Sequence, residues 1–270
     1  MSTQLTDHVV VITGGGGGIG RAVARRFLED GARVVLSGTR RDKLEAAQAE
    51  LDPSGERTLL HAGRVVTRAD AQALVAAAEE RFGGVDVLVN STGIFRPVPF
   101  LEQTEDHLEE ALGSILRPTY WVSQAVVPSM RERGGGAIVN VGSMWAQDAI
   151  ATTPTSAYSA AQAGRHALTK NLALELAPYG IRVNTVALAF VETPAYERFM
   201  TPEQARAVLE SVDGFHPLGR RGQPEDVIEA IHFLAGPGAG WITGTLLPVD
   251  GGVLAGRSPA VQPAAEPVAA

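Results

Sequence analysis

Three side chains near the middle of the chain have types and spacing suited to proton chemistry. Tyr158 and Gln162 are four residues apart in a predicted helix over 156–177, so their side chains share one helix face. Ser143 follows a short β-branched segment at 137–141, where it can act as an oxyanion donor. A phenol can transfer a proton to or from a reacting group. Gln162 cannot supply the positive charge that favours a phenolate.

A run of five glycines at 14–18 separates a predicted buried strand, 8–13, from a predicted helix, 19–30. A flexible linker is the alternative, but the strand–turn–helix–strand setting favours a turn whose backbone N–H groups bind a pyrophosphate. Two registers fit. The first is G-x-G-x-x-G at Gly15, Gly17 and Gly20. The second, T-G-x-x-x-G-I-G, is more demanding and comprises Thr13, Gly14, Gly18, Ile19 and Gly20.

The end of the second predicted strand, 33–37, distinguishes between the two nicotinamide dinucleotides. The segment 37–41 contains two arginines and two hydroxyls but no carboxylate. A carboxylate there would bind the ribose 2′-hydroxyl of NAD(H), whereas arginine accommodates the 2′-phosphate of NADP(H). NADP(H) is therefore favoured over NAD(H), with Thr39 and Arg40 as binding residues. The alternative is that Arg40 and Arg41 merely cap a surface helix.

Strand and helix patterns alternate along the rest of the chain. Further strands are predicted at 86–90, 137–141, 181–186 and 245–249, and further helices at 41–51, 69–82, around 105–133, 156–177 and 224–234. Near-continuous apolar strands between helices predict an α/β fold with a parallel sheet covered on both faces. We expect one domain over 1–255, and a disordered Pro/Ala-rich tail over 256–270.

Composition limits the functions that are open to the chain. The net charge is −7 over 270 residues with no basic stripe, so neither nucleic acid nor an anionic membrane is an expected partner. The chain has no cysteine, which excludes disulfides and thiolate chemistry. Its six histidines lack ligand spacing, so no metal site is expected. Without an apolar signal segment or membrane-length run, a cytoplasmic protein that acts on a small molecule is expected.

Seven motifs occur in the order found in the short-chain dehydrogenase/reductase family, and the chain resembles this family from about Val9 to Gly252. They are TGGGGGIG (13–20), NSTG (90–93), NVGS (140–143), YSAAQAG (158–164), IRVN (181–184), VETP (191–194) and TGTLLPVDGG (243–252). The resemblance implies a single-domain, Rossmann-type doubly wound sheet of seven parallel strands, which binds NAD(P). It also implies a homodimer or homotetramer built on the long helices.

Functional residues follow from the same resemblance by position. Ser143 and Tyr158 match the catalytic serine and tyrosine, and Gln162 occupies the position of a catalytic lysine. The resemblance places Asn90 beside the adenosine ribose, and Val191 and Thr193 at the nicotinamide carboxamide. The residues expected at the cofactor are Gly14, Gly18, Ile19, Gly20, Thr39, Arg40, Asn90, Tyr158, Gln162, Val191 and Thr193.

Two of the departures from the family pattern fall on the residues that handle the proton. Gln162 replaces a lysine and Ile115 an asparagine, so two of the four residues of the proton relay are missing. Loss of the cation removes on the order of a few kcal/mol of Coulomb stabilisation, which slows proton transfer by roughly a hundredfold or more. Lys170 lies too far along the helix to act as a substitute. His166, two turns from Tyr158, is more simply a packed or interface histidine.

The aromatic and apolar residues around the candidate site predict an apolar or aromatic pocket. Its expected residues are Trp121, Trp145, Tyr196, Phe199 and Met200, and the segment 196–215 is expected to form a lid.

Three hypotheses remain open from the sequence. The first is an NADP(H)-dependent reductase that acts on a carbonyl or imine, with Tyr158 as proton donor. The second is a redox-neutral cyclase, isomerase or dehydratase on the same fold, which the altered relay motivates. The third is a non-catalytic homologue that keeps the fold for assembly.

Overall fold

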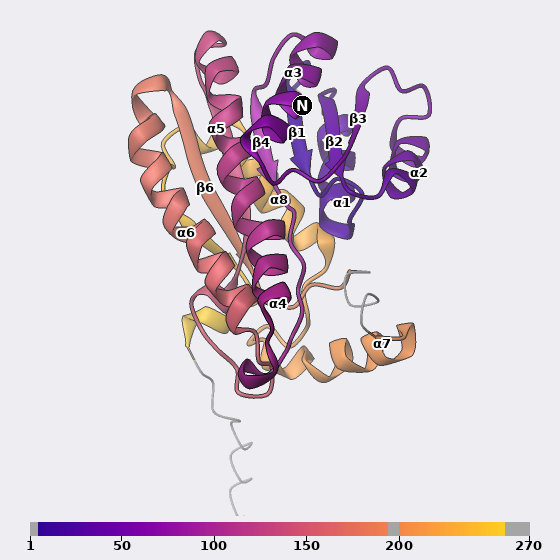
Figure 1. The fold of residues 1–270 in the computed structure, drawn as a ribbon, viewed down its shortest axis with the longest axis vertical. Coiled ribbons are helices and arrows are strands. Elements are labelled where there is room, and N and C mark those ends of the chain that lie inside the picture. Colours follow the sequence, from indigo (N-terminus) through magenta and orange to yellow (C-terminus); the bar gives the residue numbers. More distant parts are fainter. Residues whose placement is uncertain (1–4, 194–199, 257–270) are drawn as a thin grey trace, which may run out of the picture.

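Seven parallel strands form one sheet at the centre of the molecule, in the order β3-β2-β1-β4-β5-β6-β7 (Figure 1). The computed structural model describes residues 5–193 and 200–256. The strands are β1 (Val9–Thr13), β2 (Arg33–Gly38), β3 (Thr58–Ala62), β4 (Val87–Asn90), β5 (Gly136–Ser143), β6 (Ile181–Leu188) and β7 (Leu246–Val249). The order reverses between β1 and β4, as in a doubly wound sheet. The predicted single-domain Rossmann-type α/β fold is confirmed.

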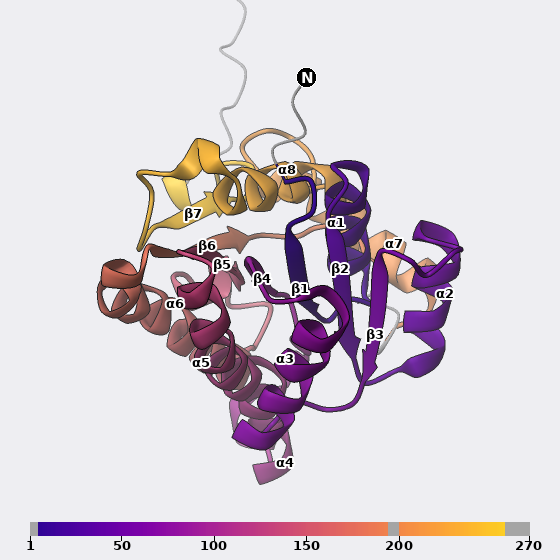
Figure 2. The same ribbon diagram turned by 90° about the horizontal axis from the view of Figure 1, so that it is seen from above.

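Helices cover both faces of the sheet. They are α1 (Gly18–Glu29), α2 (Arg41–Leu51), α3 (Arg68–Phe82), α4 (Glu105–Ala111), α5 (Arg117–Glu132), α6 (Ser156–Leu176), α7 (Pro202–Ser211) and α8 (Pro224–Ala235). Figure 2 shows α1 and α8 on one face, and α3, α5 and α6 on the other. No helix among the described residues is long and apolar enough to cross a membrane.

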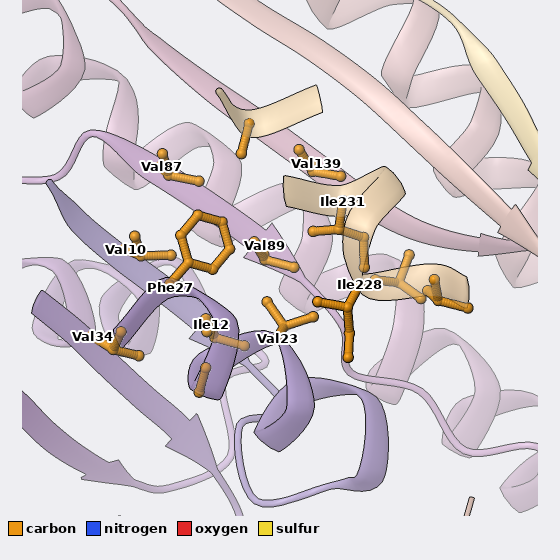
Figure 3. Close-up of a cluster of buried hydrophobic side chains, with 14 of the residues drawn as sticks. Val10, Ile12, Val23, Phe27, Val34, Val87, Val89, Val139, Ile228 and Ile231 are labelled. Atoms are coloured by element: carbon orange, nitrogen blue, oxygen red, sulfur yellow. The ribbon is translucent and has the colours of Figure 1, made fainter. Parts of the chain in front are cut away.

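The sheet separates two apolar cores because alternate residues of each strand point to opposite faces. In β1, Val10 and Ile12 pack toward α1 and α8, whereas Val9 and Val11 pack toward α3 and α5. Figure 3 shows the first core, in which Phe27 of α1 lies among strand valines. This close packing on both faces fixes the strand ends, where the candidate site residues lie.

Two elements differ from the sequence prediction. The strand β3 was not predicted from the residue pattern, because its last four residues are only partly buried at the edge of the sheet. The single helix predicted around 105–133 is instead α4 and α5 joined by a π-helical turn, Leu112–Leu116. Of the predicted lid, 196–199 lie outside the described residues and Pro202–Ser211 form α7. The predicted tail also lies outside them, apart from Gly256.

Candidate active site

The glycine-rich turn between β1 and α1 has a backbone path that side chains would obstruct. Gly14 adopts φ +73°, which side chains rarely tolerate. A Cβ on Gly20 would lie 2.3 Å from the carbonyl oxygen of Gly14. Gly18, Ile19 and Gly20 form the first turn of α1, where backbone N–H groups lack partners within the helix. The turn therefore presents donors and a helix dipole to an anion at the carboxyl end of the sheet.

The turn lies where the strand order reverses, which is where doubly wound folds bind ligands. Thr13 and Asn90 are register partners at the ends of β1 and β4. The amide of Asn90 is fully buried and donates to Asn140 Oδ1 at 2.9 Å and to Ser123 Oγ at 3.2 Å. Both hydrogens of the Asn90 amide nitrogen are therefore taken up by protein acceptors.

Arg40 lies at the end of the second strand, as expected, but it is already paired. It precedes α2 as the N-cap residue, and its guanidinium binds Asp42 through Nε at 2.9 Å and Nη2 at 2.5 Å. The bidentate pair lowers the pKa of the Asp42 carboxyl. Both side chains are exposed, as is Thr39, so Arg40 can turn to another anion at little cost.

Tyr158 and Gln162 are joined on one face of α6. Gln162 Nε2 donates to the Tyr158 hydroxyl at 3.0 Å, and the Gln162 side chain is buried. The phenol oxygen is therefore an acceptor toward Gln162, which leaves its own O–H group to donate elsewhere. Ser143 is the last residue of β5 and is also buried, and its Oγ accepts from Trp145 N at 3.4 Å.

An aromatic cluster packs against Tyr158. Phe95 meets the Tyr158 ring edge-on with centroids 5.1 Å apart, and Trp145 lies 6.2 Å from Phe95. Phe190 extends the cluster, 5.9 Å from Trp145. The sequence predicted Trp145 but not Phe95 and Phe190, which lie two residues beyond the NSTG segment and two residues beyond β6. The predicted Trp121 instead packs against the core on the α3 and α5 face.

The remaining residues expected near the nicotinamide or the substrate are partly described. Val191 forms an isolated bridge to Gly222 and lines a cavity of about 440 Å³, together with His216 and the segment 248–252. Thr193 is the last described residue before the gap. Tyr196 and Phe199 lie outside the described residues, and Met200 is half-buried at the beginning of the next described segment.

Neither cation considered from the sequence acts as a substitute for a lysine. Lys170 is exposed on the outer side of α6. His166 is buried behind the end of β5, where its Nε2 accepts the backbone N–H of Ser143 at 3.4 Å. Burial lowers the pKa of His166 to about 4, so the imidazole is neutral near pH 7.

A third cation, Arg165, was missed in the sequence. Its guanidinium is fully buried, 1% exposed, and lies three residues beyond Gln162 on the same helix face. It donates to the following five oxygens: Val141 O (2.5 Å), Thr92 O (2.7 Å), Thr119 Oγ1 (2.9 Å), Ile115 O (3.1 Å) and Gln162 Oε1 (3.5 Å). Its spacing of seven residues from Tyr158 places it on the same helix face, but spacing does not show that the guanidinium is buried against carbonyls of other segments.

Comparison with known proteins places this geometry in a family. A family model described as enoyl-(acyl carrier protein) reductase matches residues 15–254. The 3-oxoacyl-(acyl-carrier-protein) reductase FabG of Vibrio cholerae is 35% identical over 250 residues, 93% of this chain and 98% of the relative. The 2,3-dihydroxy-2,3-dihydro-p-cumate dehydrogenase of Pseudomonas putida is 36% identical over 251 residues, 92% and 95% of the two chains.

The solved structures give the same result. The crystal structure of levodione reductase matches with a TM-score of 0.86 at 33% identity, and the match covers 94% of this chain and 100% of that one. The matched relatives are named as reductases and dehydrogenases, and the glycine turn and the Ser143 and Tyr158 motifs lie in the shared fold. The chain is therefore an oxidoreductase of the short-chain dehydrogenase/reductase family, whose members use nicotinamide cofactors.

Proposed function

We propose that this chain uses NADP(H) to reduce the carbonyl or imine of a small, largely apolar substrate, with Tyr158 as the proton donor. The hydrogen bond from Gln162 Nε2 to the Tyr158 oxygen carries the proposal. Because that bond occupies the oxygen as an acceptor, the phenolic proton is directed away from Gln162 and is available to a substrate. Ser143, at the end of β5, supports the same proposal because its hydroxyl can orient the substrate.

The proposed reaction balances with one hydride and one proton. When bound, the nicotinamide cofactor supplies the hydride that forms the new C–H bond. Tyr158 gives its proton to the substrate oxygen or nitrogen, and Ser143 donates a hydrogen bond to the same atom. The phenolate that remains accepts the N–H of Gln162 until solvent returns a proton.

The residues of the glycine turn fit a dinucleotide. Because Gly20 has no Cβ, the backbone of α1 lies close to the Gly14 carbonyl of the turn. A Cβ on Gly20 would fill that space. In this proposal Gly14, Gly18, Ile19 and Gly20 bind the pyrophosphate, and Thr39 and Arg40 bind the 2′-phosphate of NADP(H). The remaining cofactor contacts are assigned to Asn90, through its main chain, and to Tyr158, Gln162, Val191 and Thr193.

The surroundings of Tyr158 favour an apolar substrate. Phe95, Trp145 and Phe190 form aromatic contacts around it, and Met144 and Ile150 belong to the same cluster. Such a pocket selects substrates by apolar contact, with few polar groups to orient the reacting atom. We further propose that the protein acts in the cytoplasm as a homodimer or homotetramer.

The test is incubation of the purified protein with NADPH and a panel of apolar ketones, aldehydes and cyclic imines. Loss of NADPH absorbance together with formation of the alcohol or amine is the expected result. Consumption with NADH at equal or higher kcat/KM contradicts the cofactor assignment. Turnover of a panel compound with unchanged dinucleotide contradicts reduction, and instead identifies the redox-neutral chemistry that the altered relay at 115 and 162 allows.

A further inference from the structure

Arg165 is a buried cation without an anionic partner among the described residues. Its neighbours are three backbone carbonyls, one hydroxyl and one amide, all of them neutral. Burying an ion in this way is unfavourable unless the charge is compensated or used. Burial lowers the pKa of Arg165 to about 10, so the guanidinium still carries its charge near neutral pH.

The five hydrogen bonds of Arg165 define how its charge can act. A guanidinium has five N–H donors, and the five oxygen acceptors match that number. No donor is left over for a substrate, so Arg165 can influence the reaction only through a neighbour. Among these five acceptor residues, Gln162 is the one whose side chain also forms a hydrogen bond with Tyr158 in the described structure.

The guanidinium sets the orientation of the Gln162 amide. Because Arg165 offers only donors, Gln162 must turn Oε1 toward it, at 3.5 Å, and Nε2 toward the Tyr158 oxygen, at 3.0 Å. An amide polarised in this direction stabilises negative charge on the phenol oxygen more than an isolated amide does. Burial lowers the pKa of Arg165, and the negative charge of an ionised Tyr158 opposes this by raising that pKa.

The π-helical turn completes the arrangement. Ile115 lies in this turn, and its carbonyl accepts both Arg165 Nη2 at 3.1 Å and Thr119 Oγ1 at 2.6 Å. Thus Arg165 contacts both positions at which the chain departs from the family relay, Ile115 through its backbone and Gln162 through its side chain. The two departures and the arginine form one connected unit.

We propose that Arg165 is a positioning residue that replaces the missing lysine, by stabilising the Tyr158 phenolate through the oriented amide of Gln162. The proposal rests on the proposed reductase function, in which the phenolate forms when Tyr158 gives up its proton. Arg165 is a different cation from Lys170 and His166, the two that were considered from the sequence.

Other titratable groups also lie near Tyr158. A small cavity beside Tyr158 is lined by Arg96, His107 and Glu110. Arg96 and Glu110 cancel each other's charge in a bidentate pair at 2.7 and 3.1 Å. His166 on α6 is neutral near pH 7. His107 is the remaining candidate, and it is therefore included as a control.

The direct test is an ultraviolet titration of tyrosinate absorbance in the cofactor-free protein. Tyr158→Phe identifies the signal of Tyr158 among the four tyrosines. We expect Arg165→Met, which keeps similar bulk without charge, to move that signal to higher pH by about one unit or more. Gln162→Leu, which leaves Arg165 in place but cuts the amide link, is expected to move it in the same direction. An unchanged signal in both variants overturns the proposal, as does a shift produced equally by His107→Gln.

Kinetics provide the second measurement. With a substrate from the reductase panel, Arg165→Met is expected to lower kcat roughly 100-fold, with KM for NADPH nearly unchanged. The double variant Arg165→Met/Gln162→Lys puts an ammonium beside Tyr158 and is expected to recover to within about tenfold of wild type. A loss of rate that the double variant does not recover, with an unshifted pH profile, indicates a structural role and contradicts the proposal.

The two measurements separate this proposal from the proposed function. If the wild-type protein does not consume NADPH but its tyrosinate signal shifts in Arg165→Met, the reductase assignment fails and the electrostatic role stands. If the enzyme is active and the signal does not shift, the reductase assignment stands and the electrostatic role of Arg165 fails. Circular dichroism of each variant verifies folding. Should Arg165→Met fail to fold, Gln162→Leu supplies the same comparison with the buried arginine retained.

Discussion

At the scale of single residues, the site depends on which atoms donate and which accept. Gln162 gives an N–H to Tyr158 and takes an N–H from Arg165, so one amide connects a phenol to a buried cation. His166 acts in the opposite sense, because its ring nitrogen accepts the backbone N–H of Ser143. Two buried side chains of α6 thus hold the two proposed catalytic hydroxyl residues from behind.

Removal of the Tyr158 hydroxyl tests the proton-donor role. Tyr158→Phe keeps the ring contacts with Phe95 and is expected to lower kcat by about 10²- to 10⁴-fold. The free energy of unfolding should fall by only about 1 kcal/mol, because one hydrogen bond is lost. Steady-state kinetics and urea unfolding measure the two effects. The exposed Tyr120→Phe serves as the control, and an equal loss of kcat there contradicts the assignment.

The ion pair between Arg40 and Asp42 leads to a prediction about the choice between NADPH and NADH. Asp42 neutralises Arg40 in the absence of a phosphate. Asp42→Asn frees the guanidinium and should tighten NADPH binding, whereas Arg40→Ala should weaken it by about tenfold and leave NADH nearly unaffected. Isothermal titration calorimetry with both cofactors measures these changes. Parallel loss of NADPH and NADH affinity in Arg40→Ala shows that the arginine does not read the 2′-phosphate.

Among single residues, the sequence predicted which side chains share a helix face, because helix periodicity fixes their positions. Tyr158 and Gln162 were expected on one helix face, and the structure joins them by a hydrogen bond. Arg165 was not found because its role depends on carbonyls from β5, the π-helical turn and the segment after β4. Those oxygens come from parts of the chain that meet only in the folded molecule, so helix spacing alone does not identify them.

At the scale of elements, long periodic segments were predictable and local irregularities were not. The bounds of α2 were predicted to the residue, whereas β3 and the break between α4 and α5 were missed. The spacing of apolar residues indicates a regular helix. A π-helical turn adds one residue to a single turn, and the amino-acid composition of the segment does not reveal it. The Ile115 carbonyl of that turn accepts a hydrogen bond from Arg165. The irregularity that the sequence did not predict therefore contacts the proposed positioning residue.

The tight contact in the glycine turn predicts the effect of a single methyl group. Gly20→Ala would put a Cβ 2.3 Å from the Gly14 carbonyl oxygen, so the turn must shift away from α1. We expect cofactor binding to weaken by at least tenfold, and stability to fall by about 1–3 kcal/mol. Calorimetry and thermal unfolding measure both. Gly63→Ala is the control, since a Cβ there meets nothing within 4 Å, and an equal thermal shift contradicts the steric argument.

At the scale of the whole molecule, exposed apolar residues on the long helices bear on assembly. Among the described helices, α5 and α6 are the longest, and they carry Tyr120 at 46% and Leu174 at 80% exposure. If copies associate through these helices, Leu174→Glu should reduce the mass measured by light scattering to that of a smaller species. Leu101→Glu, equally apolar but outside the long helices, should leave the mass unchanged. Unchanged mass for Leu174→Glu contradicts assembly on α6.

The stability of the molecule should depend on pH through its buried imidazoles. In the folded protein burial lowers the pKa of His166 to about 4, whereas an unfolded chain titrates near 6.5. The unfolded state therefore binds a proton that the folded state excludes, and the free energy of unfolding falls as pH decreases from about 6.5 to 4. The pKa of His61 is lowered in the same direction by burial.

This loss should amount to about 3 kcal/mol for His166 and level off below pH 4. The hydrogen-bonded carboxylates Asp30, Asp52 and Asp226 have pKa values lowered from 3.8. The stability that they contribute is therefore lost at a pH below the range in which His166 acts. Urea unfolding between pH 8 and 4 measures the profile, and His166→Gln, whose amide oxygen can still accept the Ser143 N–H, should flatten it. A profile that is equally steep in His166→Gln shows that His166 does not determine acid stability. Protonation of His166 would also release the end of β5, so we expect activity to fall together with stability on the acid side.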